Sequence, residues 1–303
     1  MTRLRISAIS YLNTAPLMWD FQHGPAASQF DITYTLPSAC AHALETGMAD
    51  IGIIPAAAYT RIPNLRILPG VAIASRRAVR SILLVSRVPI DKVKTVALDT
   101  SSLTSVALTK VIFEKWLGGR RTYSSMPPDL DQMLAGHDAG LLIGDPALLV
   151  DRSRYYTLDL AEEWIRHTGK PFVFAFWAAR EDALSGETSC RDRDGLCGDS
   201  RPRLSASRSD ASEPEQDLPA IFQQSRDQGL LPENLSEICR EWAPRLGLSE
   251  PDVRSYLTEN IYYQLDQGCL KGLQLFYRYA AEIGALPKAP ELCFAESAKA
   301  VVP

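Results

Sequence analysis

Short apolar runs of strand length alternate with amphipathic stretches of helix length over residues 4–180. Strands are predicted in "FDITYTLP", "DIGIIPAAAY", "RSILLVSR", "KTVALDT", "AGLLIGDPALLV" and "PFVFAFWAAR". Helices are predicted in "SACAHALETGMA", with Ser38 as its cap and Gly47 at its end, and in "SLTSVALTKVIFEKWLG". This alternation of strands and helices is typical of the α/β fold class.

The pattern changes after the last of these strands. Residues 181–218 are rich in Ser, Arg, Asp, Gly and Pro and almost lack large apolar side chains, so we expect a disordered insertion that is a solvated loop rather than a regulatory element. Apolar residues then recur at helical spacing and predict four amphipathic helices, in residues 218–230, 235–247, 249–265 and 266–284.

Polar side chains follow the first apolar run, "RISAISYLNTAPLMW". Leu4 to Leu12 alternate like a buried strand and lead into Asn13, Thr14 and Pro16, where a helix is expected to start. Ligands of open α/β sheets bind at this rim, which makes Asn13 and Thr14 candidate binding residues. Asn and Thr are also favoured helix caps, so the stretch alone leaves both interpretations open.

A cluster of hydroxyl groups follows the strand that ends at Asp99. Hydroxyls and free backbone N–H groups at a helix N-terminus can bind a carboxylate or a phosphate. Plain capping needs only one such side chain, whereas this turn has five, and we therefore favour an anion site. The five residues are Thr100, Ser101, Ser102, Thr104 and Ser105.

The stretch "LLIGDPALL" ends a strand in a similar way. Gly144 permits a close backbone approach, Asp145 stands at the strand end, and Pro146 can begin a helix. Because four strand ends share this character, we expect them to meet at one cleft. The sequence has no G-x-G-x-x-G, P-loop, G-x-S-x-G or H-E-x-x-H motif, which disfavours nucleotide binding and the corresponding hydrolases.

Composition and charge exclude several classes of partner. The 303 residues, 46% hydrophobic and 22% charged, suffice for about two domains. A net charge of −4 gives no basic surface for nucleic acid or an anionic membrane. No apolar run reaches the ~20 residues of a membrane span, and the N-terminus lacks the apolar core of a signal peptide, so we expect a cytoplasmic protein.

The cysteines and histidines show no metal-ligand spacing. The six cysteines are scattered, and we expect most of them to be buried apolar residues. Cys190 and Cys197 lie in a polar segment, where a disulfide or opportunistic metal binding is a minor alternative. We therefore predict neither a metal site nor a cofactor.

Taken together, several motifs resemble the chorismate dehydratases of menaquinone biosynthesis by the futalosine pathway. The motifs are "ISYLNTAPL", "LETGMADIGIIPAAAY", "VRSILLVSRVPIDKVKTVALDTSSLTSV", "MPPDLDQML", "LLIGDPAL" and "GKPFVFAFWAAR". The resemblance implies an α/β fold of two lobes with a central cleft, like the type II periplasmic binding proteins. The insertion at 181–218 is long for the family but touches none of these motifs.

The resemblance also implies the domain organisation. We expect lobe one in residues 1–82, lobe two in 83–180, the insertion in 181–218, and a helical return to lobe one in 219–303. A chain that leaves one sheet and later returns must cross twice. We therefore expect "RSILLVSR" and "PFVFAFWAAR" to lie side by side.

The implied reaction converts chorismate, the small-molecule partner, into 3-[(1-carboxyvinyl)oxy]benzoate and water. In the family, the polar residue of the first strand end and a serine of the lobe-crossing strand line the reaction centre. These match Asn13 and Ser81 here, although Ser81 could also be merely a small residue buried in a strand. Neither is a strong base, so we hypothesise that the enolpyruvyl carboxylate of the substrate takes the C3 proton.

Two other functions remain open at this point. One is 1,4-dihydroxy-6-naphthoate synthase, an enzyme of the same pathway and fold. That family is expected to have a first loop with Cys and Pro and a histidine base, neither of which is found here. The other is a non-catalytic cytoplasmic module that binds or senses a solute.

Overall fold

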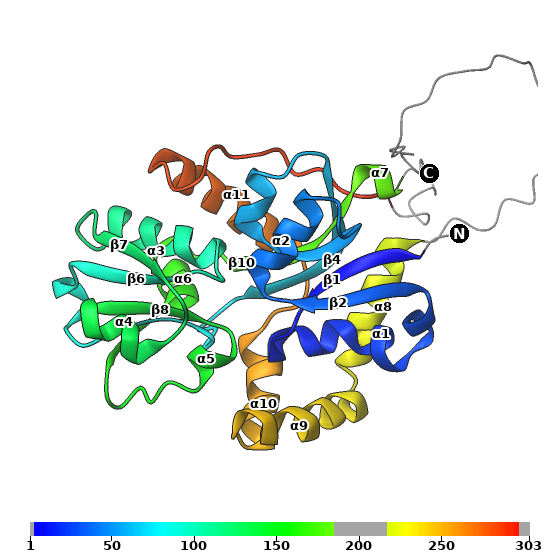
Figure 1. Ribbon diagram of the computed structural model, residues 1–303, viewed down its shortest axis with the longest axis horizontal. Helices are drawn as coiled ribbons and strands as arrows, with labels where there is room; N and C mark the ends of the chain where they lie inside the picture. Colours follow the sequence, from blue (N-terminus) through cyan, green and yellow to red (C-terminus); the bar gives the residue numbers. More distant parts are fainter. Residues whose placement is uncertain (1–2, 185–216, 297–303) are drawn as a thin grey trace, which may run out of the picture.

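The structure, a computed structural model, describes residues 3–184 and 217–296, and it contains two five-stranded sheets (Figure 1). The first has the order β2-β1-β3-β10-β4 and the second β7-β6-β8-β5-β9. The first sheet consists of β1 (Leu4–Ile9), β2 (Phe30–Thr35), β3 (Ile51–Pro55), β4 (Leu65–Ser75) and β10 (Phe172–Arg180). The second consists of β5 (Ile82–Ser86), β6 (Thr95–Asp99), β7 (Thr122–Met126), β8 (Ala139–Ile143) and β9 (Tyr156–Asp159).

Helices cover both sheets, and each sheet with its helices forms one lobe (Figure 1). The helices before residue 185 are α1 (Trp19–His23), α2 (Pro37–Glu45), α3 (Thr104–Lys115), α4 (Leu130–Gly136), α5 (Asp145–Leu148), α6 (Leu160–Thr168) and α7 (Glu181–Leu184). Those after residue 216 are α8 (Leu218–Gly229), α9 (Pro232–Leu246), α10 (Glu250–Ser255) and α11 (Gln267–Glu282). Short helical turns are η1 (Leu12–Met18), η2 (Pro25–Ser28), η3 (Ala56–Thr60), η4 (Ile90–Lys92) and the π-helical η5 (Tyr256–Asn260).

Strand β10 lies between β3 and β4 in the first sheet. It runs antiparallel to both β3 and β4, and all its residues except Arg180 are buried, as expected for a strand covered on both faces. Helix α11 packs on β10 and also contacts α3 of the second lobe. The rings of Trp164, Phe172 and Phe276 meet edge to face between these elements, so one aromatic cluster joins the lobes.

The α/β alternation and the strands predicted from apolar runs are confirmed, but the expected crossing is wrong. Strand β10 pairs with β3 and β4, whereas β5, which contains "ILLVS", pairs with β8 and β9 in the second sheet. Strand β4 escaped prediction because Pro69 and Gly70 interrupt it, and such a pair usually indicates a turn. Here Gly70 has φ of 85° and the β4–β10 register is irregular, so the strand continues through a bulge.

Several predicted boundaries also differ from the structure. Helix α2 begins at Pro37 after Leu36, so Ser38 is not its cap, and the third C-terminal helix ends at Asn260 rather than 265. The predicted lobe boundary at 180 places β10 in the second lobe, yet β10 belongs to the first sheet. Residues 181–184 form α7 and Asp217 caps α8; the rest of the predicted insertion, with Cys190 and Cys197, lies outside the described residues.

The described cysteines follow the prediction for apolar residues. Cys40, Cys239 and Cys269 are buried, Cys293 is half-buried, and none of these four forms a disulfide. The acidity of the Cys40 thiol is suppressed by burial, which raises its pKa to about 12. These side chains therefore act as packing residues.

Close packing of α8 on η1 predicts a large effect of Gly229→Ala. A Cβ at Gly229 would lie 2.0 Å from the backbone oxygen of Pro16, and neither backbone can move without disturbing η1. We expect a loss of about 2–4 kcal/mol in the free energy of unfolding, measured by urea denaturation. Gly136→Ala is the matched control, since a Cβ there meets nothing within 4 Å; equal stability of the two variants would contradict the packing argument.

Candidate active site

A cavity of about 450 Å³ lies between the two lobes. Its lining combines the ends of β1 and β3, the middle of β10, and the first turns after β6 and β8. Among the described residues the lining has no charged side chain; its polar side chains are an amide and four hydroxyls. The lining residues are Ile9, Tyr11, Asn13, Pro37, Pro55, Ile73, Ile82, Ser102, Thr104, Ser105, Ile143, Gly144, Phe174 and Ala175.

Asn13 reaches this cavity from a 3-10 turn and not from a helix cap. Strand β1 ends at Ile9, η1 begins at Leu12, and Pro16 lies inside η1, so the expected start of a helix at Pro16 is wrong. Because Asn13 caps nothing, its amide is available for other contacts. The amide oxygen accepts a hydrogen bond from Thr14 Oγ1 at 3.3 Å.

Ser81 lies behind the cavity wall. Its side chain is fully buried, and its Oγ accepts a hydrogen bond of 2.8 Å from Tyr256 Oη. Tyr256 is 1% exposed, so this hydrogen bond is buried. No sequence pattern indicated this contact of Tyr256, because an aromatic residue at helical spacing usually indicates only core packing.

The hydroxyl-rich turn after β6 divides into an outer and an inner part. Ser102, Thr104 and Ser105 line the cavity, whereas Ser101 turns inward and donates from its N and Oγ to Asp99 Oδ1, at 2.8 and 2.7 Å. Helix α3 begins at Thr104, and Ser102 Oγ accepts a hydrogen bond of 3.3 Å from the N–H of Ser105 in its first turn. The turn therefore presents hydroxyls together with a helix N-terminus.

Thr104 also ties the lobes together. Its Oγ1 accepts from the backbone N–H of Ala57 at 3.0 Å and donates to the backbone oxygen of Phe174 at 3.1 Å. Ala57 and Phe174 belong to η3 and β10 of the first lobe. One hydroxyl thus fixes the distance between α3 and the strand that completes the first sheet.

Gly144 lines the cavity, and Asp145 follows it outside the lining. Gly144 has φ of 63°, and a Cβ there would lie 2.7 Å from the Tyr11 ring, so both backbone geometry and space require glycine. Asp145 Oδ1 accepts a hydrogen bond of 3.1 Å from the N–H of Leu12 across the lobe boundary. Burial raises the pKa of Asp145 to about 6, and burial also raises the pKa of Asp99.

The structure thus brings nine of the ten candidate residues together; the tenth, Thr100, is exposed. Asn13, Ser102, Thr104, Ser105 and Gly144 line the cavity. The other four do not line it: Thr14 donates to Asn13, Ser81 accepts from Tyr256, Ser101 donates to Asp99, and Asp145 accepts from Leu12.

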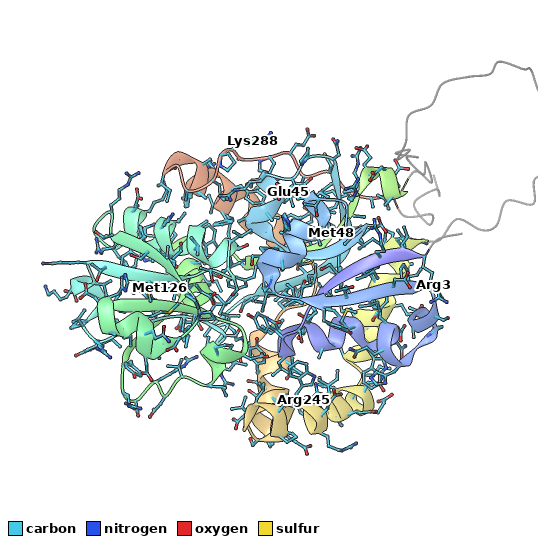
Figure 2. The ribbon with its side chains drawn as sticks, in the orientation of Figure 1. Arg3, Glu45, Met48, Met126, Arg245 and Lys288 are labelled. Carbon is cyan, nitrogen blue, oxygen red and sulfur yellow. The ribbon has the colours of Figure 1, made fainter. Side chains whose placement is uncertain are left out.

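A second hollow of about 630 Å³ lies on the other side of Tyr11 and Thr14. Trp242 and Arg245 of α9 line its outer side, and Arg245 is seen at the lower edge of the molecule in Figure 2.

Within the described ranges, no three His, Cys, Asp or Glu side chains are grouped so that they could hold a metal ion. No helix in the same ranges has the length and apolar character needed to cross a membrane.

Comparison with known proteins identifies the family. Residues 4–196, more than half of the chain, match the sequence model of a family described as "Menaquinone biosynthesis". The chain belongs to this menaquinone biosynthesis family. A relative, the chorismate dehydratase of Thermus thermophilus, is 26% identical over 298 residues, which cover 92% of this chain and 94% of the relative.

Solved structures agree on the fold. A protein from Archaeoglobus fulgidus superimposes with a TM-score of 0.64 and 16% identity, covering 94% of this chain and 98% of that one. The alkanesulfonate-binding protein of Xanthomonas axonopodis pv. citri, bound to MOPS, gives a TM-score of 0.59 at 15% identity with 96% of each chain covered. A Candida albicans protein with the generic periplasmic binding protein fold gives 0.59 at 11% identity over all of both chains. The predicted two-lobed, periplasmic-binding-protein-like fold is therefore confirmed.

The environment of Asp145 predicts a pH-dependent stability. Its folded pKa of about 6 lies above the ordinary value of ~3.9, so the folded state binds the proton more tightly. The stability that this tighter proton binding adds to the folded state is complete below about pH 4 and is lost as the pH rises through 6. We therefore expect the free energy of unfolding of Asp145→Asn, relative to that of wild type, to be about 2–3 kcal/mol higher at pH 7 than at pH 4. Urea denaturation at the two pH values measures this.

Asp138→Asn is the control with the opposite sign. Backbone N–H groups of Lys94 and Thr95 hold the pKa of Asp138 below its ordinary value. This variant should lose more stability at pH 7 than at pH 4. A stability difference for Asp145→Asn that does not vary with pH would show that burial does not govern this carboxyl group.

Proposed function

We propose that this protein is a chorismate dehydratase, a hydro-lyase that converts chorismate into 3-[(1-carboxyvinyl)oxy]benzoate and water. The family and the Thermus thermophilus relative support this assignment. The structural observation that carries it is the cavity between the lobes, where the amide of Asn13 faces the hydroxyl turn of α3. We further propose that the reaction takes place in the cytoplasm, which fractionation of cells with an antibody against the protein tests.

The cavity can hold a dianion without a cationic side chain. Helix α3 is 12 residues long and begins at Thr104, which lines the cavity, and partial positive charge accumulates at the first N–H groups of a helix. The hydroxyls of Ser102 and Ser105 are available as further donors beside them. We assign one carboxylate of chorismate to this helix start.

The reaction itself needs only a proton acceptor and a stabilised leaving group. The C3–H bond breaks, its electron pair delocalises through the ring toward the ring carboxylate, and the C4–O bond then breaks. The departing hydroxyl takes up a proton and leaves as water, and the ring becomes aromatic. Because aromatisation drives the elimination, the enzyme contributes mainly orientation and electrostatic stabilisation.

No carboxylate or histidine side chain lines the cavity among the described residues. This supports the enolpyruvyl carboxylate of chorismate as the acceptor of the C3 proton. In this proposal Asn13 donates to the leaving hydroxyl or to the developing oxyanion. Ser81 acts from behind the wall through Tyr256.

Incubation of the purified protein with chorismate, followed by chromatography and ultraviolet detection, tests the function directly. The aromatic enol ether should appear at the rate at which chorismate disappears. Absence of turnover with tight chorismate binding would favour a solute-binding module instead. Absence of both, with turnover of the cyclic futalosine derivative, would favour 1,4-dihydroxy-6-naphthoate synthase.

Asn13→Leu should lower turnover strongly while the protein remains folded. The variant loses a hydrogen bond made mainly in the transition state, which we expect to lower kcat about 30- to 1000-fold, or about 2–4 kcal/mol. Asn234→Leu is a matched control. Asn234 lies in the first turn of α9, and its side-chain amide donates a hydrogen bond to the backbone oxygen of Gln228. An Asn13→Leu protein with unchanged kcat would remove Asn13 from the mechanism.

Ser81→Ala should have the milder effect. If the carboxylate of the substrate is the base, Ser81 contributes only through the hydrogen bond with Tyr256, and kcat should fall less than about tenfold. Steady-state kinetics with chorismate measure this. A loss as large as that of Asn13→Leu would instead indicate that Ser81 itself transfers the proton.

A further inference from the structure

Arg80 has a backbone conformation that an arginine does not favour. It lies in the connection of residues 76–81 that leads from β4 of the first lobe to β5 of the second, and its φ is 65°. Within residues 3–184 and 217–296 the other non-glycine residue with positive φ is Asn64, and asparagine tolerates this left-handed region. For a long side chain the conformation costs free energy and persists only where the surroundings impose it.

The carboxylate of Asp159, at the end of β9, holds this part of the chain. Its side chain is buried, Oδ2 accepts from the N–H of Arg80 at 2.7 Å, and Oδ1 accepts from the N–H of Val79 at 3.1 Å. Oδ1 also caps helix α6, since it accepts from the N–H groups of Ala161 and Glu162, each at 3.1 Å. Asp159 therefore fixes two successive N–H groups of the connection relative to helix α6.

Two further side chains hold the carbonyl groups of the same connection. Arg152 Nη2 donates to the backbone oxygen of Arg80 at 2.9 Å, and Asn260 Nδ2 donates to that of Ala78 at 2.9 Å. The peptide groups before and after Arg80 are thus both held by side chains from elsewhere in the fold. These hydrogen bonds can offset the cost of the positive φ.

The connection ends at the reaction centre of the proposed function. Ser81 directly follows Arg80, and its buried Oγ accepts from Tyr256 Oη at 2.8 Å. The backbone oxygen of Ser81 accepts from the N–H of Gly144 at 2.8 Å, and both Gly144 and Ile82 line the cavity. The orientation of the peptide group between Arg80 and Ser81 therefore sets the place of a candidate catalytic residue and of part of the cavity wall.

We propose that Asp159 is a positioning residue, which holds Arg80 at positive φ and thereby places Ser81 and Gly144 for the reaction. The role rests on the proposed function. Asp159 does not line the cavity and acts through the backbone. Without its carboxylate, the N–H of Arg80 loses its acceptor, and Arg80 can turn to the negative φ that arginine prefers, which reorients the peptide group that leads to Ser81.

Asp159→Asn and Asp138→Asn form a matched pair of variants. Asp138 Oδ2 also accepts from two successive backbone N–H groups of the second lobe, those of Lys94 and Thr95, each at 2.9 Å. Neither of these residues has positive φ, and none of the three lines the cavity. We expect Asp159→Asn to lower kcat about 10- to 50-fold, whereas Asp138→Asn should keep kcat within about twofold. Equal kcat values for the two variants would overturn the proposal.

The loss in Asp159→Asn should exceed that in Ser81→Ala, because the turned peptide group displaces Gly144 as well as the serine. The KM for chorismate should change less than about threefold, since the start of α3, which we assign to a carboxylate of the substrate, is left in place. Steady-state kinetics with chorismate measure both constants. A rise in KM without a loss in kcat would show that Asp159 supports binding and not the reaction.

Arg80→Gly separates positioning from general destabilisation. Glycine adopts positive φ about as readily as negative φ, so with glycine at this position the conformation no longer depends on Asp159. Asp159→Asn should then lower kcat less than about threefold when it is added to Arg80→Gly. Urea denaturation should still show a loss of stability in both backgrounds, because the cap of α6 is removed in each. A kcat loss as large as in the wild-type background would show that Asp159 contributes only to stability.

A spectroscopic measurement keeps the inference separate from the assignment of the reaction. The ¹³Cα and ¹³Cβ chemical shifts of Arg80 depend on its φ, with or without dehydratase activity. Asp159→Asn should move them to values typical of negative φ, and Asp138→Asn should leave them unchanged. Unmoved Arg80 shifts in Asp159→Asn would overturn the proposal, whereas an inactive wild type would overturn only the proposed function.

Arg152→Met takes the place of Asp159→Asn if that variant does not fold. It removes the donor to the backbone oxygen of Arg80 and leaves the cap of α6 intact. We expect it to move the Arg80 shifts and to lower kcat about 3- to 10-fold, but less than about twofold when it is added to Arg80→Gly. Unmoved shifts, or equal kcat losses in the two backgrounds, would overturn the proposal.

Discussion

The return of the chain into the first sheet is the constraint on which the rest of the structure depends. Strand β10 fits between β3 and β4, and without it the first sheet would be divided in two. The same strand supplies Phe174 and Ala175 to the cavity and the backbone oxygen that receives the Thr104 hydroxyl. Strand β10, which follows all strands of the second sheet in the chain, therefore completes both the first lobe and the site.

The sequence predicted what depends on local pattern. Buried strands appear as apolar runs, and polar residues at the ends of β1, β6 and β8 come together because strand ends of one sheet share an edge. Strand β7 was missed because its residues are polar and half-exposed, and β4 was missed because Pro69 and Gly70 indicate a turn until β10 is present beside them. The contact of Tyr256 with Ser81 was missed because the two residues lie more than 170 positions apart in the chain.

The electrostatics of this cavity are unusual for a site that binds an anion. Two carboxyl groups, the buried Asp99 and the half-buried Asp145, lie near the cavity, and no lysine or arginine balances them among the described lining residues. Burial shifts both toward the neutral form, which weakens their repulsion of a bound dianion. Neutral donors at fixed positions can then provide the stabilisation that cations supply in other anion sites.

The contacts between the lobes also bear on the timing of turnover. Four of the hydrogen bonds across the boundary are Leu12 to Asp145, Ala57 to Thr104, Thr104 to Phe174, and Ser38 to Ser101. Each is worth about 0.5–1.5 kcal/mol net, because water replaces the lost partner when the bond opens. Together the four contribute about 2–6 kcal/mol to holding the lobes together. Any separation of the lobes to release a product would have to break all four.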